Sequence, residues 1–290
     1  GLEAIDEVTI VSVPDLVAAL EQGAIDLETY QAVQLAVIAH CELMGNRLAI
    51  LDPPPGGLNP QQIKDWRVNT AGYDSKYATL YWPYIKVFDP STGSNRFVPP
   101  SGHMAGIWRA TTTSVACTRL PPTRWSAGAI TLQTQITKAE HELLNPVGIN
   151  AIRTFPRPRG GPRVGGRPDL SSDPAWRYVN VRRLFNYLEE SILTGTQWVV
   201  FEPNDDALWA RIRRTISAFL VNEWRKGGRC SGSVPTRRSS SSATGRPTPA
   251  EAIDAGQVTC RIGGVAPVKP AEFVIFQLSQ FSGGTSLASE

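Results

Sequence analysis

Short apolar runs and one helical pattern fill the start of the chain. Val8–Val13 is rich in β-branched residues and stops at Pro14-Asp15, which indicates a strand. Leu48–Leu51 predicts a second, buried strand that ends in a Pro- and Gly-rich loop. Between them, Gln31–Met44 shows helical spacing, with one expected buried face formed by Val33, Ala36, Val37, His40, Cys41 and Met44. Strand, helix and strand in this order predict a parallel βαβ unit.

The middle of the chain continues this mixture. Asn59-Pro60 predicts the start of a short helix through Trp66, because Pro at the first turn costs no hydrogen bond. Tyr77–Phe88 is aromatic and β-branched and predicts one strand, and Pro99–Gly102 predicts the start of a helix through about Ala110. Ala129–Ile136 alternates apolar and polar residues, as a half-buried strand does. The fold class we expect is α/β, a mixed sheet flanked by helices.

Two long helical patterns follow a Pro-, Gly- and Arg-rich stretch, Arg157–Pro168, which we interpret as a loop and a domain boundary. Gln197–Phe201, between the two patterns, predicts a short buried strand. The first helix has an apolar stripe of Val181, Leu184, Phe185, Leu188 and Ile192. The second has a stripe of Leu208, Ile212, Ile216, Phe219 and Leu220.

The last part of the chain is less regular. Gly227–Pro249 is rich in Ser, Arg, Pro and Gly and predicts a loop, whereas Val258–Ile262 and Glu272–Leu278 predict strands. Phe281–Glu290 has the composition of a polar tail. We therefore expect a core domain over residues 1–168 and a second, α+β domain over residues 169–290.

Composition limits the classes of function. The chain has 290 residues, 41% hydrophobic, with a net charge of +3. This balance does not favour binding to nucleic acid or to an anionic membrane. The sequence has no apolar run long enough to cross a bilayer, and its first residues lack the pattern of a secretory signal. Its 4 Cys are far apart and form no CxxC pair, so we expect buried or incidental thiols.

The residues that could carry chemistry form no recognisable site. His40, His103 and His141 have no metal-binding spacing, and His40 is expected to be a packed helix residue. Glu189-Glu190 and Asp205-Asp206 fit solvated or helix-capping roles better than a catalytic pair of carboxylates. Ser101 lacks a GxSxG turn, and Gly160–Gly166 lacks the order of a phosphate loop. We expect no enzyme activity and no cofactor.

One long run of residues resembles a known protein family. Asp173–Pro203, which contains the letters DPAWRYVNVRRLFNYLEESI and GTQWVVFEP, closely resembles the C-terminal region of tail sheath proteins of contractile phages and related contractile injection systems. Val98–His103 (VPPSGH), Leu144–Asn150 (LNPVGIN) and Ala266–Ile275 (APVKPAEFVI) are similar to further sheath segments. The resemblance covers nearly the whole chain, and it implies that an additional N-terminal part of the full protein is missing here.

The resemblance implies a structural subunit. Such subunits form six-membered rings stacked around an inner tube and contract to drive the tube through a target envelope. The implied partners are other copies of the subunit, the tube protein, and baseplate and terminator or cap proteins. The implied location is a phage tail or phage-tail-like particle that is assembled in the bacterial cytoplasm and can be released outside the cell. A terminal strand exchanged between subunits would comprise Glu272, Phe273, Val274, Ile275, Phe276, Gln277 and Leu278.

The basic residues of the second long helix suggest a further contact. Because the planar guanidinium of arginine binds charged groups well, we expect the tube to contact Arg211, Arg214, Arg225 and Lys226. Two alternatives to a contracting sheath stay open at this point. One is a non-contracting sheath paralogue of a cap or baseplate, and the other is an enzyme on an α/β core.

Three stretches depart from the sheath pattern. Residues 116–126 and 235–241 each give a family-like peptide when a permitted back-translation is read in another frame. We therefore hypothesise local frameshifts at both places, which resequencing of the gene would test. Residues 164–170 depart as well.

Overall fold

The computed structural model describes residues 1–115, 128–155, 161–164, 169–225, 277–281 and 284–288. A five-stranded sheet in the order β1-β2-β3-β7-β8 forms its centre. Four strands run parallel, and β8 pairs antiparallel with β7. Their bounds are β1 Ile10–Ser12, β2 Leu48–Leu51, β3 Ala78–Trp82, β7 Ile149–Phe155 and β8 Gly161–Val164. The predicted parallel βαβ unit is confirmed, because β1 and β2 pair in parallel, and the connection between them contains two helices, α1 (Asp15–Glu21) and α2 (Leu27–Met44).

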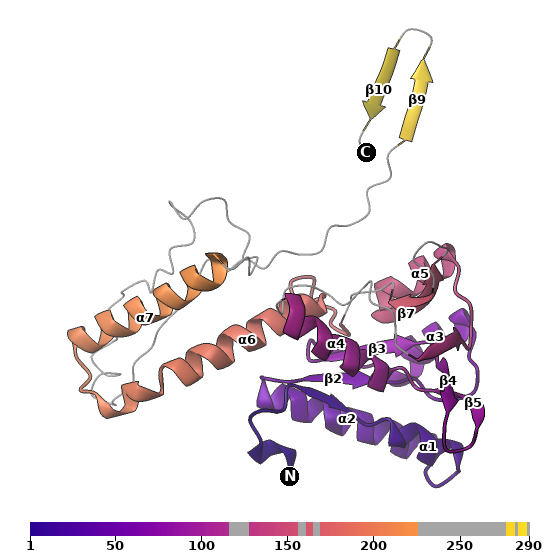
Figure 1. The fold of residues 1–290 in the computed structure, drawn as a ribbon, viewed down its shortest axis with the longest axis horizontal. Coiled ribbons are helices and arrows are strands. Elements are labelled where there is room, and N and C mark those ends of the chain that lie inside the picture. Colours follow the sequence, from indigo (N-terminus) through magenta and orange to yellow (C-terminus); the bar gives the residue numbers. More distant parts are fainter. Residues whose placement is uncertain (116–127, 156–160, 165–168, 226–276, 282–283, 289–290) are drawn as a thin grey trace.

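Helices cover both faces of this sheet (Figure 1). On one face, Ala49 and Leu51 share a core with residues of α2 (Leu27–Met44), α3 (Pro60–Asp65) and α5 (Lys138–Leu144). On the other face, Leu48 and Ile50 pack with α4 (Ser101–Val115) and with the start of α6 (Val179–Gly195). Every residue of β2 is buried for this reason, and the expected α/β class is confirmed.

The interior residues of α2 differ from the predicted set. The structure buries Tyr30, Gln34, Ile38 and Cys41, whereas Ala36 is exposed and His40 is half-buried. The reason lies in hydrogen bonding. The Tyr30 hydroxyl and the Gln34 amide donate to the carbonyl oxygen of Asp52 at 2.8 and 2.7 Å, so the buried polar groups are satisfied. Apolar spacing alone does not predict this buried helix face, because the face includes the polar residues Tyr30 and Gln34.

The expected strand Tyr77–Phe88 is two strands in different sheets. β3 ends at Trp82, and β4 (Ile85–Asp89) belongs to a separate antiparallel sheet with β5 (Ser94–Val98) and β6 (Ala129–Leu132). The prediction of one strand was wrong because Pro83 stands between them. Proline has no N–H for a sheet ladder and fixes its own φ angle.

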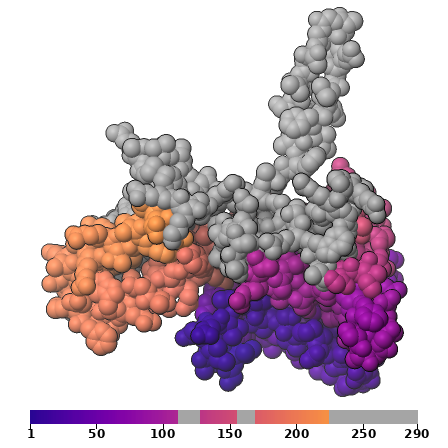
Figure 2. Space-filling model, in the orientation of Figure 1, coloured from indigo at the N-terminus to yellow at the C-terminus, as the bar shows by residue number. Residues whose placement is uncertain are grey.

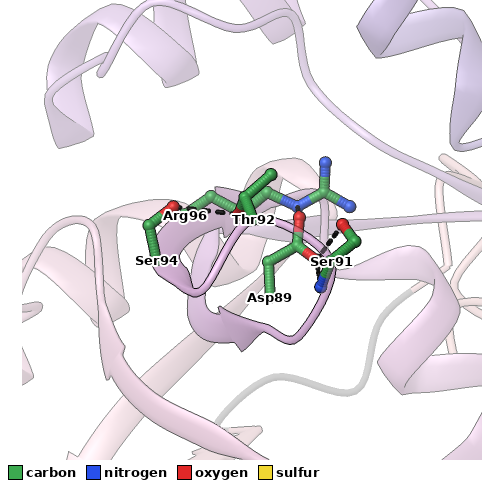
Figure 3. A network of polar contacts seen from close by, with 5 residues as sticks. All are labelled: Asp89, Ser91, Thr92, Ser94 and Arg96. Atoms are coloured by element: carbon green, nitrogen blue, oxygen red, sulfur yellow. Dashed lines mark hydrogen bonds and ion pairs between the residues drawn. The ribbon is translucent and has the colours of Figure 1, made fainter.

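A compact polar turn joins β4 to β5 (Figure 3). One oxygen of Asp89 accepts hydrogen bonds from the Ser91 backbone N–H at 3.0 Å and from its hydroxyl at 2.6 Å. The other oxygen pairs with Arg96 across the hairpin at 3.2 Å. Gly93 supplies the positive φ of the turn. The turn therefore fixes the register in which Asp89 faces Ser94.

The two long helices form an antiparallel helical hairpin at one end of the molecule (Figure 1). α6 leads through a 3₁₀ turn, η4 (Gln197–Phe201), into α7 (Asp206–Arg225). The predicted apolar stripe of α7 is confirmed in its first part, since Leu208, Ile212 and Ile216 are buried against residues of α6 and η4. The predicted buried strand at Gln197–Phe201 was wrong: no described strand lies beside it, and Phe201 is 90% exposed.

Two smaller corrections concern the loops. The stretch expected to be a loop from 157 to 168 contains β8, and the expected polar tail contains β10 (Gly284–Ala288), which pairs antiparallel with β9 (Gln277–Phe281). The predicted loop 227–249 and strand 258–262 lie outside the described residues, as do both hypothetical frameshift stretches. The remaining elements are η1 (Leu2–Ala4), α1 (Asp15–Glu21), η2 (Trp66–Ala71) and η3 (Asn145–Val147).

Candidate interaction surfaces

A buried arginine joins the helical hairpin to the sheet. Arg182, on the first turn of α6, is 2% exposed. Its guanidinium lies 4.6 Å from the ring centre of Trp176 and 4.8 Å from that of Tyr77, which precedes β3. The same group donates to Asn186 at 2.5 Å and pairs with Glu189 at 2.7 Å. Arg182 therefore combines an ion pair, ring stacking and hydrogen bonds, and it ties α6 to the start of the central strand β3.

This anchor is hard to predict from the sequence. Arg182 sits beside the apolar stripe of α6, and an arginine there is usually assigned to solvent. The only hint is that Trp176 and Phe185 flank it, one on each side. In the structure these two rings meet edge to face at 4.9 Å, and the guanidinium lies over both.

Three residues of the two predicted acidic pairs have structural partners. Asp205 accepts a hydrogen bond from the Leu208 backbone N–H at 2.7 Å, so it caps α7 as expected. Glu189 pairs with Arg182, and Glu190 accepts from Asn46 at 3.5 Å. Each carboxylate therefore stabilises a helix or a contact between elements.

The end of the hairpin exposes a group of large apolar side chains, which we call the hairpin ridge: Leu193, Val200 and Phe201. They are 62%, 82% and 90% exposed. Trp198 fixes the conformation of this turn, because its indole donates a hydrogen bond to the carbonyl of Gly195 at 3.0 Å and packs with the buried residues of α7. Exposed apolar groups on a fixed turn are typical of an interaction surface.

The structure describes only some of the residues expected to contact the tube. Arg211 is exposed but engaged, since it pairs with Glu202 at 2.9 Å and lies 4.2 Å from the ring centre of Trp198. Arg214 is exposed on the outer side of α7. The side chain of Arg225 and all of Lys226 lie outside the described residues. The proposed tube contact stays a prediction.

The expected inter-subunit strand is only partly described. Glu272, Phe273, Val274, Ile275 and Phe276 lie outside the described residues, and Gln277 and Leu278 begin β9. Leu278 faces Leu287 of β10 in an antiparallel pair, and among the described strands β9 and β10 bond only to each other. A two-stranded hairpin is marginal by itself, so further strand pairing would stabilise it. Exchange of this strand between subunits stays a prediction.

Asp52 and Asp169 are buried carboxyl groups, and neither forms an ion pair with another described residue. Asp52 directly follows β2 and accepts a hydrogen bond from the backbone N–H of Ser101, the first residue of α4, at 3.0 Å. Asp169 accepts from the N–H of Ser171 at 2.9 Å. Burial raises the pKa of each to about 7, against the lowering effect of these hydrogen bonds. Asp52 thereby fixes the start of α4 to the sheet.

A groove of about 260 Å³ runs beside the edge strand β1. Apolar residues of β1 and β2 form its floor, and α4 and α6 contribute charged walls: Ile10, Leu48, Arg109, Arg183, Tyr187 and Glu190. Within the described part of the chain, no group of three or more His, Cys, Asp or Glu residues could hold a metal ion. No described helix is long and apolar enough to cross a membrane. The groove's mixed charge fits a contact surface better than a reaction site.

Solved structures with similar folds are contractile assemblies. The helical sheath of the anti-feeding prophage in the contracted state matches with a TM-score of 0.76 and 26% identity, over 97% of this chain and 72% of that one. The sheath complex of the extracellular contractile injection system PVC, also contracted, matches with a TM-score of 0.72 and 29% identity, over 85% and 68%. The anti-feeding prophage baseplate matches with a TM-score of 0.71 and 28% identity, over 88% and 66%.

Curated relatives agree with this. The tail sheath protein of Vibrio phage KVP40 is 28% identical over 165 residues, and that of Enterobacteria phage T4 is 25% identical over 220 residues. These matches cover 56% and 70% of this chain, which spans 24% and 33% of the two relatives. The phage tail sheath central domain model matches residues 2–166, and the phage tail sheath C-terminal domain model matches residues 171–281. Because these matches cover most of its length, the chain belongs to the phage tail sheath family.

Proposed function

We propose that this chain is part of a subunit that polymerises as stacked six-membered rings around an inner tube and contracts to drive the tube through a target envelope. The observation that carries the proposal is the fold match to a helical sheath in its contracted state, together with the family matches to both halves of the chain. The subunit's partners would be its own copies, the tube, the baseplate and a terminator or cap. It would be assembled in the bacterial cytoplasm as part of a phage tail or phage-tail-like particle.

The physical basis of contraction would be a difference between two subunit packings. Such a change needs no cofactor if an assembled, higher-energy packing is converted to a lower-energy one. Strand addition would keep neighbours joined meanwhile, because backbone hydrogen bonds survive changes in side-chain contacts. The segment 272–278 would be the donor, and deletion of residues 271–290 should abolish polymerisation. Normal tubes from that truncated chain, seen by electron microscopy, would count against strand exchange.

The surface of the subunit that faces the inner tube would include the exposed side of α7. Arg214 is exposed there, and Arg211 is oriented by Glu202 and Trp198. Charge reversal at Arg214 and Arg225 should weaken co-sedimentation of polymers with the tube protein. The control is charge reversal at Lys138, which is 71% exposed on the separate helix α5. Equal tube binding by both variants would remove the proposed contact.

A second candidate is a non-contracting sheath paralogue at the baseplate or cap, because two of the similar folds belong to baseplate structures. Negative-stain microscopy of the purified protein separates the two. Stacked tubes support the sheath, whereas single rings that never stack favour the paralogue.

A further inference from the structure

Residues 169–178, which we call the joint segment, connect the sheet domain to the helical hairpin. They span the boundary between the two family matches, which end at residue 166 and begin at residue 171, and they lead directly into α6. The hairpin projects from the sheet domain as a separate lobe, coloured salmon to orange (Figure 1 and Figure 2). The contacts that hold the joint segment to the sheet therefore decide how firmly this lobe is oriented.

The joint segment is hydrogen-bonded to the start of β3 and to the turn before it. The N–H of Leu170 donates to the carbonyl of Ala78 at 3.0 Å, and the Leu170 side chain is buried in the core. Asp74, in the turn before β3, accepts from the N–H of Ser172 at 3.0 Å and from its hydroxyl at 2.6 Å. Asp74 is exposed, and the two bonds from Ser172 lower the pKa of its carboxyl. Asp74 is therefore ionised near neutral pH while it holds the segment.

Asp169 is the buried carboxyl of this joint. It is 1% exposed, and its Oδ1 accepts from the N–H of Ser171 at 2.9 Å. Its Oδ2 is buried and has no hydrogen-bond partner in the described part of the chain. The backbone is equally confined, because a Cβ on Gly148 would lie 2.9 Å from the Asp169 carbonyl oxygen. A buried carboxylate oxygen without a donor is costly when charged, whereas the protonated acid carries no charge that needs water.

The charges around Asp169 do not remove this cost. Burial raises its pKa to about 7, and the charge of Asp74 raises it as well, whereas the Ser171 hydrogen bond, Arg177 and Arg182 lower it. Further charged groups at the joint, each with a partner of its own, are Arg67, Lys76, Asp173 and Glu189. Asp169 is thus the one member of the Asp74–Asp169 pair that burial keeps protonated.

We propose that Asp169 is a proton-dependent latch between the sheet domain and the helical hairpin. With the proton bound, the joint segment stays packed against β3. After loss of the proton, the carboxylate gains by reaching water and is repelled by the ionised Asp74, so the open segment becomes more populated. Opening also removes Trp176 from the guanidinium of Arg182, which lies 4.6 Å from its ring centre, and so loosens the start of α6. The inference concerns a single subunit and does not depend on polymerisation.

The pH dependence has a definite sign, because the carboxyl binds its proton more tightly in the closed segment than in the open one. The ordinary value of 3.8 applies to the open segment, and the raised pKa applies to the closed one. The latch is therefore tightest below about pH 4, loosens by about tenfold per pH unit, and levels off above about pH 7. Between about pH 4.5 and pH 7, the equilibrium constant for opening should rise by ~100-fold.

Hydrogen exchange of the full chain, read by mass spectrometry and corrected for the intrinsic effect of pH on exchange, measures this opening. In wild type, protection of residues 169–182 should fall by ~100-fold between about pH 4.5 and pH 7, and at pH 7 it should be lower than protection of β2. Asp169→Asn, which mimics the protonated acid, should keep similar protection at both pH values. Circular dichroism checks that each variant folds.

Asp52→Asn is the matched control. Asp52 is also a buried carboxyl that accepts from a backbone N–H and has a pKa of about 7, but it lies at the start of α4. This variant should therefore leave the pH dependence of the joint segment unchanged. A pH dependence in Asp169→Asn like that of wild type would overturn the latch. Equal protection of residues 169–182 and β2 at pH 7 would overturn it too, because the joint would then open only with the whole domain.

Asp74→Asn provides a second test that leaves Asp169 in place. The amide oxygen can still accept from Ser172, but the negative charge is gone, so the pKa of Asp169 should fall. The loss of protection with rising pH should then be smaller and should level off at a lower pH than in wild type. A profile that levels off at the same pH as in wild type would overturn the assigned repulsion between the two carboxylates.

Discussion

Replacement of Arg182 is the most informative perturbation of this fold, because this side chain combines stacking, packing and charge at the junction of α6 with the sheet. Arg182→Ala removes all three, and Arg182→Met removes the charge but keeps an unbranched apolar stem. Glu189, the ion-pair partner, is 56% exposed in its side chain, so it returns to water when the arginine is lost.

The cost follows from the contacts. Two ring contacts at 4.6 and 4.8 Å contribute about 1 kcal/mol each, and the buried stem contributes about 2 kcal/mol. The bonds to Asn186 and Glu189 contribute about 1.5 to 3 kcal/mol, at the lower end because Glu189 is exposed. Release of a buried charge offsets about 2 kcal/mol. We expect Arg182→Ala to lower the free energy of unfolding by about 3 kcal/mol, and Arg182→Met by about 1 kcal/mol, because methionine keeps the packing against the rings.

Urea unfolding followed by circular dichroism measures both changes, with the slope of the transition compared among variants. Hydrogen exchange of the α6 amides adds a local measurement, since loss of the anchor should raise exchange in α6 before β2 and β3. The reasoning fails if Arg182→Ala costs less than about 1 kcal/mol. It also fails if Arg182→Met costs as much as Arg182→Ala, because charge would then outweigh packing.

Three further predictions follow from single contacts. Burial raises the pKa of Asp52 from 3.8 to about 7, so the folded state binds the proton of this carboxyl more tightly than the unfolded state does. The protonated carboxyl therefore stabilises the fold fully below about pH 4, and this stabilisation is lost as the pH rises to about 7. Asp52→Asn should therefore gain on the order of 4 kcal/mol relative to wild type between pH 4 and 7, and parallel urea midpoints across this range would contradict it. Gly148→Ala should destabilise by about 2 kcal/mol or more, because φ is +84° and a Cβ would lie 2.9 Å from the carbonyl oxygen of Asp169. Gly106→Ala, in a helix with open space, should instead be neutral or stabilising by about 1 kcal/mol, and equal thermal shifts for the two would refute the argument. Asp205→Ala should cost about 1 kcal/mol through loss of the α7 cap, measured by thermal unfolding, whereas Asp206→Ala, the neighbour outside the cap, should cost less.

Local patterns in the sequence determined the elements that carry a clear period or a clear stop signal. The Asn59 cap of α3, the Asp205 cap of α7 and the apolar stripe of α7 depend on neighbours within a few residues, and the order of strand, helix and strand along the chain indicated the βαβ unit. Sequence resemblance determined the family, because the matching segments lie in both halves of the chain. These features depend on residue order alone.

The tertiary structure decided everything that depends on a partner distant in the chain. Gln34 is buried because a carbonyl at Asp52 accepts its hydrogen bond, and Arg182 is buried because Tyr77 and Trp176 enclose it. Conversely, Val200 and Phe201 have the composition of a buried strand but are exposed, because no described strand lies beside them. The sequence fixes which side chains are apolar or charged. Only the fold decides which of them find a partner inside the subunit and which are left for a partner outside it, since burial is a property of contacts between distant segments.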